Sequence, residues 1–380
     1  MIPFPRALSL LAPAAAWFAV ATQAAGGPYA PAAGRDGSTA VHMDEDAFVA
    51  WASNYSAVTY GSGVADEWKT PEKALGKAVG DAFDIVSLGR GGRITFEFES
   101  PITDGEGPDF AVFENPFSDY FLELGFVEVS SNGTDFVRFA NDSQTAAAVG
   151  AFGLLNPTDI TGYAGKYRQG YGTPFDLADC DGLSPDVDVR AIRYVRIVDI
   201  VGDGNTTDSS GDPIYDPHPT TGSAGLDVEA LGVLNATTEV ALYLGDHGLA
   251  GPDADSGADP DEDGVPNLRE FAFGSDPSDP GSLPARKTRI LVADDSLHFV
   301  LSVPVRAGGE MEGTVYAVDG LRYETTGSTD LETWDEPVEI VVNPDGLPPV
   351  ADGYVWLSFR LANDLAHAAR GFLRTQVTEQ

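Results

Sequence analysis

Alternation of apolar and polar side chains predicts that the chain is mainly β between residues 41 and 236. The segment 93–98 reads Arg-Ile-Thr-Phe-Glu-Phe, which places its three apolar side chains on one face. Turn dipeptides such as Asn132-Gly133 separate the apolar runs. Short strands between long Gly- and Asp-rich loops predict an antiparallel jelly-roll sandwich. The expected strands cover residues 93–98, 110–114, 126–129 and 194–200.

Helical spacing of apolar residues predicts two short helices outside these strands. Asp44 stands before apolar residues spaced three and four apart over 48–55, which indicates a capped helix. A second helix is expected over 240–247, with Thr237 or Thr238 as its N-cap and Gly248 at its end.

The last hundred residues return to a β pattern. An apolar turn over 268–272, closed by Gly274, and a proline-rich exit precede this region. The pattern predicts a small C-terminal β-sandwich with strands at 297–303, 315–318, 356–361 and 372–377.

The first two dozen residues have the pattern of a secretory signal. Arg6 precedes an apolar run from Ala7 to Ala21, and small residues that suit cleavage follow. The run is too short for a membrane span of roughly 20 apolar residues. We therefore expect an extracytoplasmic protein, secreted or at the cell surface. The expected division is 1–24 signal peptide, 25–40 flexible leader, 41–236 jelly-roll domain, 237–282 helix and metal loop, and 283–380 C-terminal β domain.

The composition is strongly acidic but compatible with packed cores. Asp and Glu number 59 against 22 Lys and Arg, and the formal net charge is −37. This charge argues against nucleic acid and anionic membranes as partners. Cys180 is the single cysteine, so no intramolecular disulfide can form. Divalent cations are the candidates for tying down the long loops.

One acidic segment fits a calcium-binding loop at every defined position. Residues 259–270 read DPDEDGVPNLRE, which matches D-x-D-x-D-G-x₅-E. Calcium prefers six to eight hard oxygen ligands, and a glycine at the sixth position permits the tight turn between them. The expected ligands of Ca²⁺ are Asp259, Asp261, Asp263, the Val265 carbonyl, Asn267 and Glu270.

The alternative for this segment is an acidic, proline-rich linker that binds nothing. Pro266 departs from the usual EF-hand pattern, and no second complete loop exists for pairing. We expect a weak affinity of the extracellular class, roughly 10⁻⁴–10⁻³ M. The nearby acids either assist this site or form a second weak one: Asp253, Asp255, Asp276 and Asp279.

The loop resembles those of dockerins and thrombospondin type 3 repeats. Its continuation through Asn267–Pro277, NLREFAFGSDP, is similar to single acidic loops in many exported bacterial proteins. The resemblance covers roughly 30 residues and implies a metal without indicating what the protein does.

The first β region resembles discoidin-like, galactose-binding-domain jelly rolls. The residues that carry this are 126–136 (FVEVSSNGTDF), 192–197 (IRYVRI) and 72–76 (EKALG). Residues 86–92 (VSLGRGG) together with 109–115 (DFAVFEN) are similar to an uncharacterised family of bacterial cell-surface proteins. The resemblance implies a structural calcium near the last strand, with Asp227 or Glu229 as a ligand; the alternative is that these acids form turns or are solvated.

Aromatic and basic residues between 163 and 175, together with Tyr215, form a candidate sugar site. Aromatic faces stack on sugar rings while charged groups bond their hydroxyls. The candidate ligand-binding residues are Tyr167, Arg168, Tyr171 and Tyr215; the alternative is that these loops satisfy their own packing.

The C-terminal segment 323–334 (YETTGSTDLETW) resembles small β domains at the ends of exported bacterial proteins, and Trp334 is expected to be a core anchor. The five histidines are scattered, and neither a nucleophile elbow nor a phosphate-binding glycine loop occurs. We therefore expect a non-enzymatic, calcium-binding surface protein that acts as a binding or adhesion module for a glycan or another surface ligand. The alternatives are a small-nutrient capture protein for an outer-membrane transporter, and a polysaccharide hydrolase or its accessory module.

Overall fold

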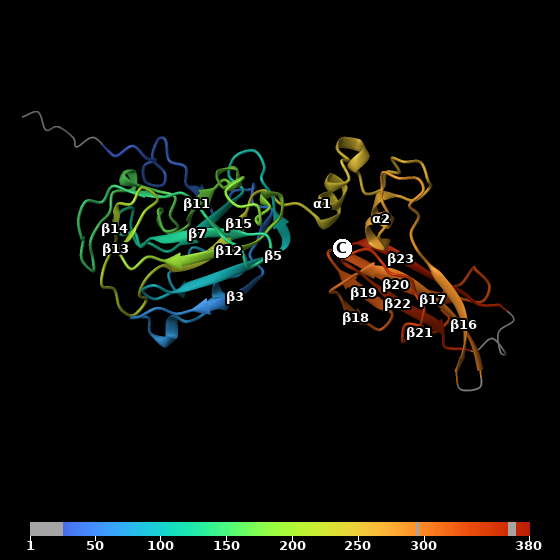
Figure 1. The fold of residues 1–380 in the computed structure, drawn as a ribbon. Helices are drawn as coiled ribbons and strands as arrows, with labels where there is room; N and C mark the ends of the chain where they lie inside the picture. The colour runs from blue at the N-terminus through green and yellow to red at the C-terminus, as the bar shows by residue number, and fades with distance from the viewer. Residues whose placement is uncertain (1–25, 294–295, 364–369) are drawn as a thin grey trace, which may run out of the picture.

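The computed structural model describes residues 26–293, 296–363 and 370–380. The predicted signal peptide, residues 1–24, lies outside these residues. The chain is mainly β and forms two lobes joined by a helical segment (Figure 1). Within the described ranges, no helix is both long and apolar enough to cross a membrane.

Two antiparallel sheets that share one apolar core build the first lobe. Each of the four predicted strands is confirmed, within a few residues of its expected ends. The five-stranded sheet runs in the order β3 (Asn54–Thr59), β5 (Arg93–Ile102), β12 (Ile192–Asp199), β7 (Gly125–Ser130) and β8 (Val137–Arg138). The second sheet runs in the order β1 (Val41–His42), β11 (Tyr171–Phe175), β6 (Phe110–Glu114), β15 (Asp227–Val233) and β2 (Ala50–Trp51), with β4 (Val86–Ser87) also paired to β15.

The core between these sheets follows the predicted alternation. Ile94 and Phe96 of β5 and Val195 and Ile197 of β12 are buried against apolar residues of β6 and β15. Two small ribbons, β9 (Asp142–Ser143) with β10 (Ile160–Thr161) and β13 (Asp203–Thr207) with β14 (Pro213–Tyr215), lie in the connecting loops. Single 3₁₀ turns occupy Asp66–Trp68, Pro71–Ala74, Pro157–Asp159, Leu177–Cys180, Val189–Ala191 and Gly251–Ala254.

The predicted helix over 48–55 is wrong, because this segment crosses between the two sheets. The backbone N–H groups of Val49 and Ala52 donate to carbonyls of β15, at 2.9 and 3.0 Å, and that of Ser53 donates to the Glu97 carbonyl of β5 at 3.1 Å. Long-range hydrogen bonds to two sheets thus replace the local bonds of a helix. The aromatic ring of Phe48 instead packs on that of Trp51, with centroids 4.8 Å apart.

Residues 26–40, for which the composition predicts a flexible leader, pack along the first lobe. The backbone of Tyr29 donates to the Thr158 carbonyl at 3.1 Å, and the hydroxyl of Thr39 bonds that of Tyr167 at 2.8 Å. Ala32 and Ala33 are buried. Contacts with distant residues therefore fix the path of this glycine-rich segment.

The second lobe contains two four-stranded antiparallel sheets. The predicted C-terminal strands are confirmed, although four further strands were not expected. One sheet runs β16 (Lys287–Ala293), β17 (Ser296–Arg306), β22 (Tyr354–Leu361) and β21 (Val338–Val341). The other runs β18 (Glu310–Glu312), β19 (Val315–Val318), β20 (Leu321–Ser328) and β23 (Phe372–Glu379).

Trp334 is half-buried rather than central to this core. The guanidinium of Arg374 lies over its ring, 3.9 Å from the centroid. Trp334, which was predicted to anchor the core, therefore packs under a charged side chain at the edge of the core.

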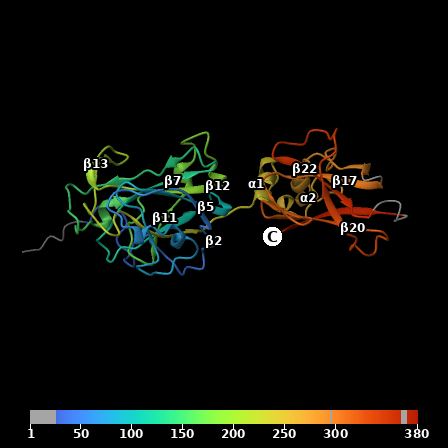
Figure 2. The ribbon, with the colours of Figure 1, turned by 90° about the horizontal axis from the view of Figure 1, so that it is seen from below.

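The helices α1 (Glu239–Asp246) and α2 (Asn267–Phe273) lie beside the second lobe in both views (Figures 1 and 2). The hydroxyl of Thr238 caps α1 by accepting from the Ala241 backbone at 3.1 Å, as predicted. Gly274 ends α2 with φ of 76°, a conformation that glycine adopts without strain. Both helices contribute to the apolar cluster of the second lobe, so the metal-loop region belongs to that body.

Two tyrosines fasten α2 to the sheets beneath it. The hydroxyl of Tyr323 donates to the Ala272 carbonyl at 2.8 Å, and that of Tyr354 donates to the Phe271 carbonyl at 2.5 Å. These bonds satisfy backbone carbonyls near the end of the helix, which have no partner within it.

Candidate metal centre

The predicted calcium loop brings its three aspartates together. Oxygens of Asp259, Asp261 and Asp263 lie within 4.8 Å of one another, so this set could hold a metal ion. The loop curls because its own carboxylates accept backbone N–H groups. Asp259 accepts from the backbone of Asp263 at 3.2 Å and from that of Gly264 at 2.9 Å, and Asp263 accepts from Val265 at 2.7 Å.

The remaining predicted side-chain ligands are held from α2 and are completely buried. Asn267 and Glu270 are both 0% exposed. The side-chain Nδ2 of Asn267 donates to the carbonyls of Asp253 and Asp255, each at 2.8 Å. Its side-chain oxygen takes no part in these two bonds. One oxygen of Glu270 accepts from the Ser275 hydroxyl at 3.2 Å.

Four oxygens of this loop are buried without a hydrogen-bond partner in the described part of the chain. They are Asp261 Oδ2, Asp263 Oδ2, Asn267 Oδ1 and Glu270 Oε2. Buried polar atoms in folded proteins are nearly always paired, and an unpaired one is costly. A cluster of unpaired acceptors, without a donor among them, is the arrangement that a hard cation satisfies.

Desolvation and repulsion between the carboxylates destabilise the loop when no cation is bound. Burial, and then the charges of Asp261, Asp263 and Asp259, raise the pKa of Glu270 to about 7. A bound divalent cation removes this penalty because it attracts the ionised form of each carboxylate.

No family model and no curated protein matches this chain.

The acidic residues that flank the loop contribute differently from expectation. Asp253 and Asp255 approach it through their backbone carbonyls, which accept from Asn267. Downstream, Asp276 accepts from the backbone of Ser278 at 2.9 Å, and Asp279 accepts from that of Gly281 at 2.9 Å. These two carboxylates therefore stabilise turns.

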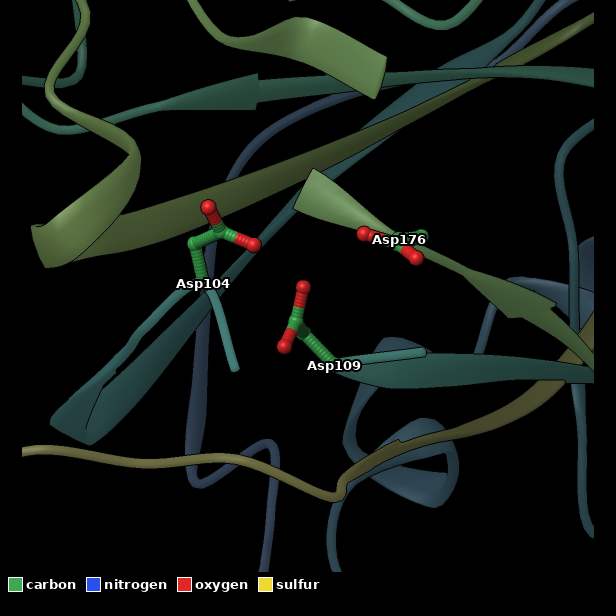
Figure 3. Close-up of side chains that lie close together, drawn as sticks. All are labelled: Asp104, Asp109 and Asp176. Carbon is green, nitrogen blue, oxygen red and sulfur yellow. The ribbon is translucent and has the colours of Figure 1, made fainter. Parts of the chain in front are cut away.

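A second set of acids that could hold a metal ion lies in the first lobe. The carboxylates of Asp104, Asp109 and Asp176 face one another from the ends of β5, β6 and β11 (Figure 3). Asp109 already accepts from the backbones of Gly105 at 2.8 Å and Leu177 at 2.7 Å. No sequence motif marks this set, because Asp176 lies 67 residues after Asp109 in the chain and reaches it through the pairing of β11 with β6.

The two acids expected near the last strand, Asp227 and Glu229, meet different partners. Oε1 of Glu229 accepts from the backbone of Val79 at 2.9 Å and also from that of Gly80, while its Oε2 is buried without a partner among the described residues. Asp227 lines a pocket at the start of β15, and its Oδ1 is also unpaired within the described ranges. Burial raises the pKa of Asp227 to about 7.

The structure does not present the expected sugar-stacking surface. Tyr167 is 1% exposed, and its hydroxyl bonds Thr39, so its ring faces are covered by protein. Arg168 forms an ion pair with Asp119 at 2.7 Å and lies over the ring of Tyr171. Tyr215 is half-buried in β14. These residues mainly satisfy one another, which corresponds to the packing alternative.

Three acids, one at the end of β12 and two in the long loop that follows it, act as backbone acceptors. Asp199 accepts from the backbone of Gly91 at 2.6 Å and of Leu226 at 2.7 Å. Asp216 accepts from the backbone of Leu124 at 2.9 Å, and Asp208 accepts from that of Ser143 at 2.9 Å. The loop is therefore held by carboxylates that cap distant backbone segments.

Proposed function

We propose that this chain is an exported calcium-binding protein whose first lobe is a non-catalytic binding module with a discoidin-like jelly roll. The observation that carries the calcium assignment is the set of four buried, unpaired oxygens within a loop of EF-hand spacing. Asp259, Asp261, Asp263, the Val265 carbonyl, Asn267 and Glu270 would hold the ion. Calcium supplies positive charge there and no catalytic step.

The position of the loop defines what calcium would do. The loop follows α1 and runs into the first turn of α2, and both helices share an apolar cluster with the sheets of the second lobe. The two ends of α1 pair with the first lobe: Glu239 at its start pairs with Arg193, and Asp246 at its end pairs with Arg190 at 2.9 Å. An ion that orders the loop would therefore stabilise the segment through which the two lobes are connected.

Calorimetric titration of the full mature chain with CaCl₂ tests this function. We expect one saturable site with a dissociation constant of roughly 10⁻⁴–10⁻³ M, as in extracellular calcium modules. The double variant D261N/E270Q should lose this heat. The matched control E262Q removes an exposed acid of the same loop, and it should bind like the natural chain. Absence of calcium heat in the natural chain would reject the proposal.

A further inference from the structure

A pocket in the first lobe contains a second group of unpaired carboxylates. It lies where β6 ends and β15 begins, next to the loop that leads into β7, and has a volume of about 340 Å³. Glu114 comes from the end of β6, Asp227 from the start of β15, and Glu123 from the loop. Pairing of β6 with β15 therefore brings two of these acids together.

Each of these acids has an oxygen that the protein leaves unsatisfied. Glu114 Oε2, Glu123 Oε1 and Asp227 Oδ1 are buried and have no hydrogen-bond partner among the described residues. The three side chains are at most 7% exposed. The fourth unpaired atom is the side-chain oxygen of Asn115, a neutral residue that is 4% exposed and lines the same pocket. These four buried acceptors lie in the wall of the pocket, which the hydroxyls of Thr220, Thr221 and Ser223 also line.

The charge of the pocket is not compensated from within. Among the described residues that line it, none is basic. Buried carboxylates are normally paired with a cation or with several donors. Since the wall supplies hydroxyl donors but no positive charge, a ligand that carries a cation with N–H donors would complement these carboxylates.

The size and the rim of the pocket favour an organic cation over a bare metal ion. At about 30 Å³ for each water molecule, its volume corresponds to roughly ten waters. In the described chain, the acid sets with oxygens within 4.8 Å of one another lie elsewhere, and these three carboxylates do not form one. The rim carries Phe117 and Phe152, which are 77% and 89% exposed. Exposed aromatic rings beside acids suit a ligand with an apolar stem and a cationic end.

We propose that this carboxylate pocket binds the primary ammonium or guanidinium group of a basic ligand, with Glu114, Glu123 and Asp227 as acceptors. The charged end pairs with these carboxylates, and the apolar stem lies against the phenylalanines of the rim. This deepens the proposed function, because it assigns a chemical class of ligand to the binding module.

Titration of the full mature chain with small lysine and arginine derivatives tests the assignment. The probes are Nα-acetyl-lysine methylamide and Nα-acetyl-arginine methylamide, and the uncharged control is Nα-acetyl-norleucine methylamide. Binding is measured by ligand-observed NMR in 5 mM CaCl₂ and again in EDTA. We expect at least one basic probe to bind saturably and the norleucine derivative to bind at least tenfold more weakly.

Variants then locate the site. E123Q/D227N should weaken the binding of the basic probe at least tenfold, and F152A, an exposed rim change, should weaken it severalfold. The control E99Q removes an exposed acid outside the pocket and should leave binding unchanged. Because F152A alters an exposed side chain, it remains informative if the double variant does not fold.

Several outcomes would overturn the assignment. These are no binding of either basic probe, equal binding of the norleucine derivative, or unchanged binding in both pocket variants. Calcium that displaces the probe from the natural chain and from E270Q alike would make the pocket a metal site instead. E270Q also keeps the two proposals distinguishable. If it binds the probe with the affinity of the natural chain, the pocket does not depend on the calcium loop.

Discussion

Substitution of Glu270 by Gln should remove about half or more of the thermal stabilisation that calcium gives to the second lobe. The side chain is completely buried beside three aspartates, and one of its oxygens is unpaired in the described structure. Gln keeps the volume and the contact with Ser275 but removes the charge that a calcium ion needs. Affinity should fall at least tenfold.

The size of the effect follows from mass action. At 10 mM calcium and a dissociation constant of roughly 10⁻⁴–10⁻³ M, binding stabilises the natural chain by about 1.4–2.7 kcal/mol. Residues 237–380 unfold with an entropy of roughly 0.3 kcal/mol/K, at about 2.1 cal/mol/K for each residue. The melting temperature of the second lobe should therefore rise by about 5–9 °C in the natural chain, and by about half of that or less in E270Q.

Differential scanning calorimetry in 10 mM CaCl₂ and in EDTA measures both shifts. The comparison uses shifts rather than absolute melting temperatures, because removal of a buried carboxylate also stabilises the metal-free form. E262Q should shift like the natural chain, and 10 mM MgCl₂ should give a smaller shift because Mg²⁺ requires a tighter octahedral shell. Equal calcium shifts in E270Q and E262Q would refute the assignment of Glu270 as a ligand.

Three further predictions concern buried groups. Burial lowers the pKa of Lys166 to about 8, while its ammonium donates to the Ile160 carbonyl at 2.7 Å. Since the unfolded chain holds this proton up to higher pH, urea unfolding should show the natural chain gaining about 2 kcal/mol over K166M between pH 7 and 9.5. Burial raises the pKa of Cys180 to about 12, so Ellman's reagent should modify it in urea but not in the folded protein; fast labelling of the native thiol would contradict this. Y323F leaves the Ala272 carbonyl without its donor and should lower the free energy of unfolding by about 1–2 kcal/mol; no loss would show that water replaces the hydroxyl.

The sequence predicts those elements that depend on local chemistry. Helix α1 starts at the Thr238 cap, and α2 ends at Gly274, because capping groups act within one turn of the helix end. The strand β5 follows from alternation, since one of its faces is buried. The spacing of residues 259–270 likewise brings the three aspartates together without help from distant segments.

Features that depend on pairing between distant segments could not be predicted in this way. The helical spacing over 48–55 failed because the N–H groups of Val49 and Ser53 bond strands from two different sheets. Exposure of Tyr167 was misjudged because its cover, Thr39, lies 128 residues away in a segment whose composition indicates flexibility. In each case the partner that decides the outcome is remote in sequence.

In this acidic chain, structural acids differ from candidate functional ones in whether hydrogen-bond donors of the protein reach both carboxylate oxygens. Asp199 accepts backbone N–H groups at both oxygens, so although burial raises its pKa to about 7, its geometry is complete without a ligand. Glu123 is different, because burial, and then the charges of Asp227 and Asp216, raise its pKa to about 10 while one oxygen has no described partner. Glu270 in the metal loop shares both properties. Such groups cost stability, and a bound cation would compensate them. Glu229 also combines a raised pKa with an unpaired buried oxygen. At the loop and at the pocket, however, several unpaired oxygens come together, and the loop alone of these two has three acids with oxygens within 4.8 Å of one another. We therefore propose a metal ion at the loop and an organic cation at the pocket.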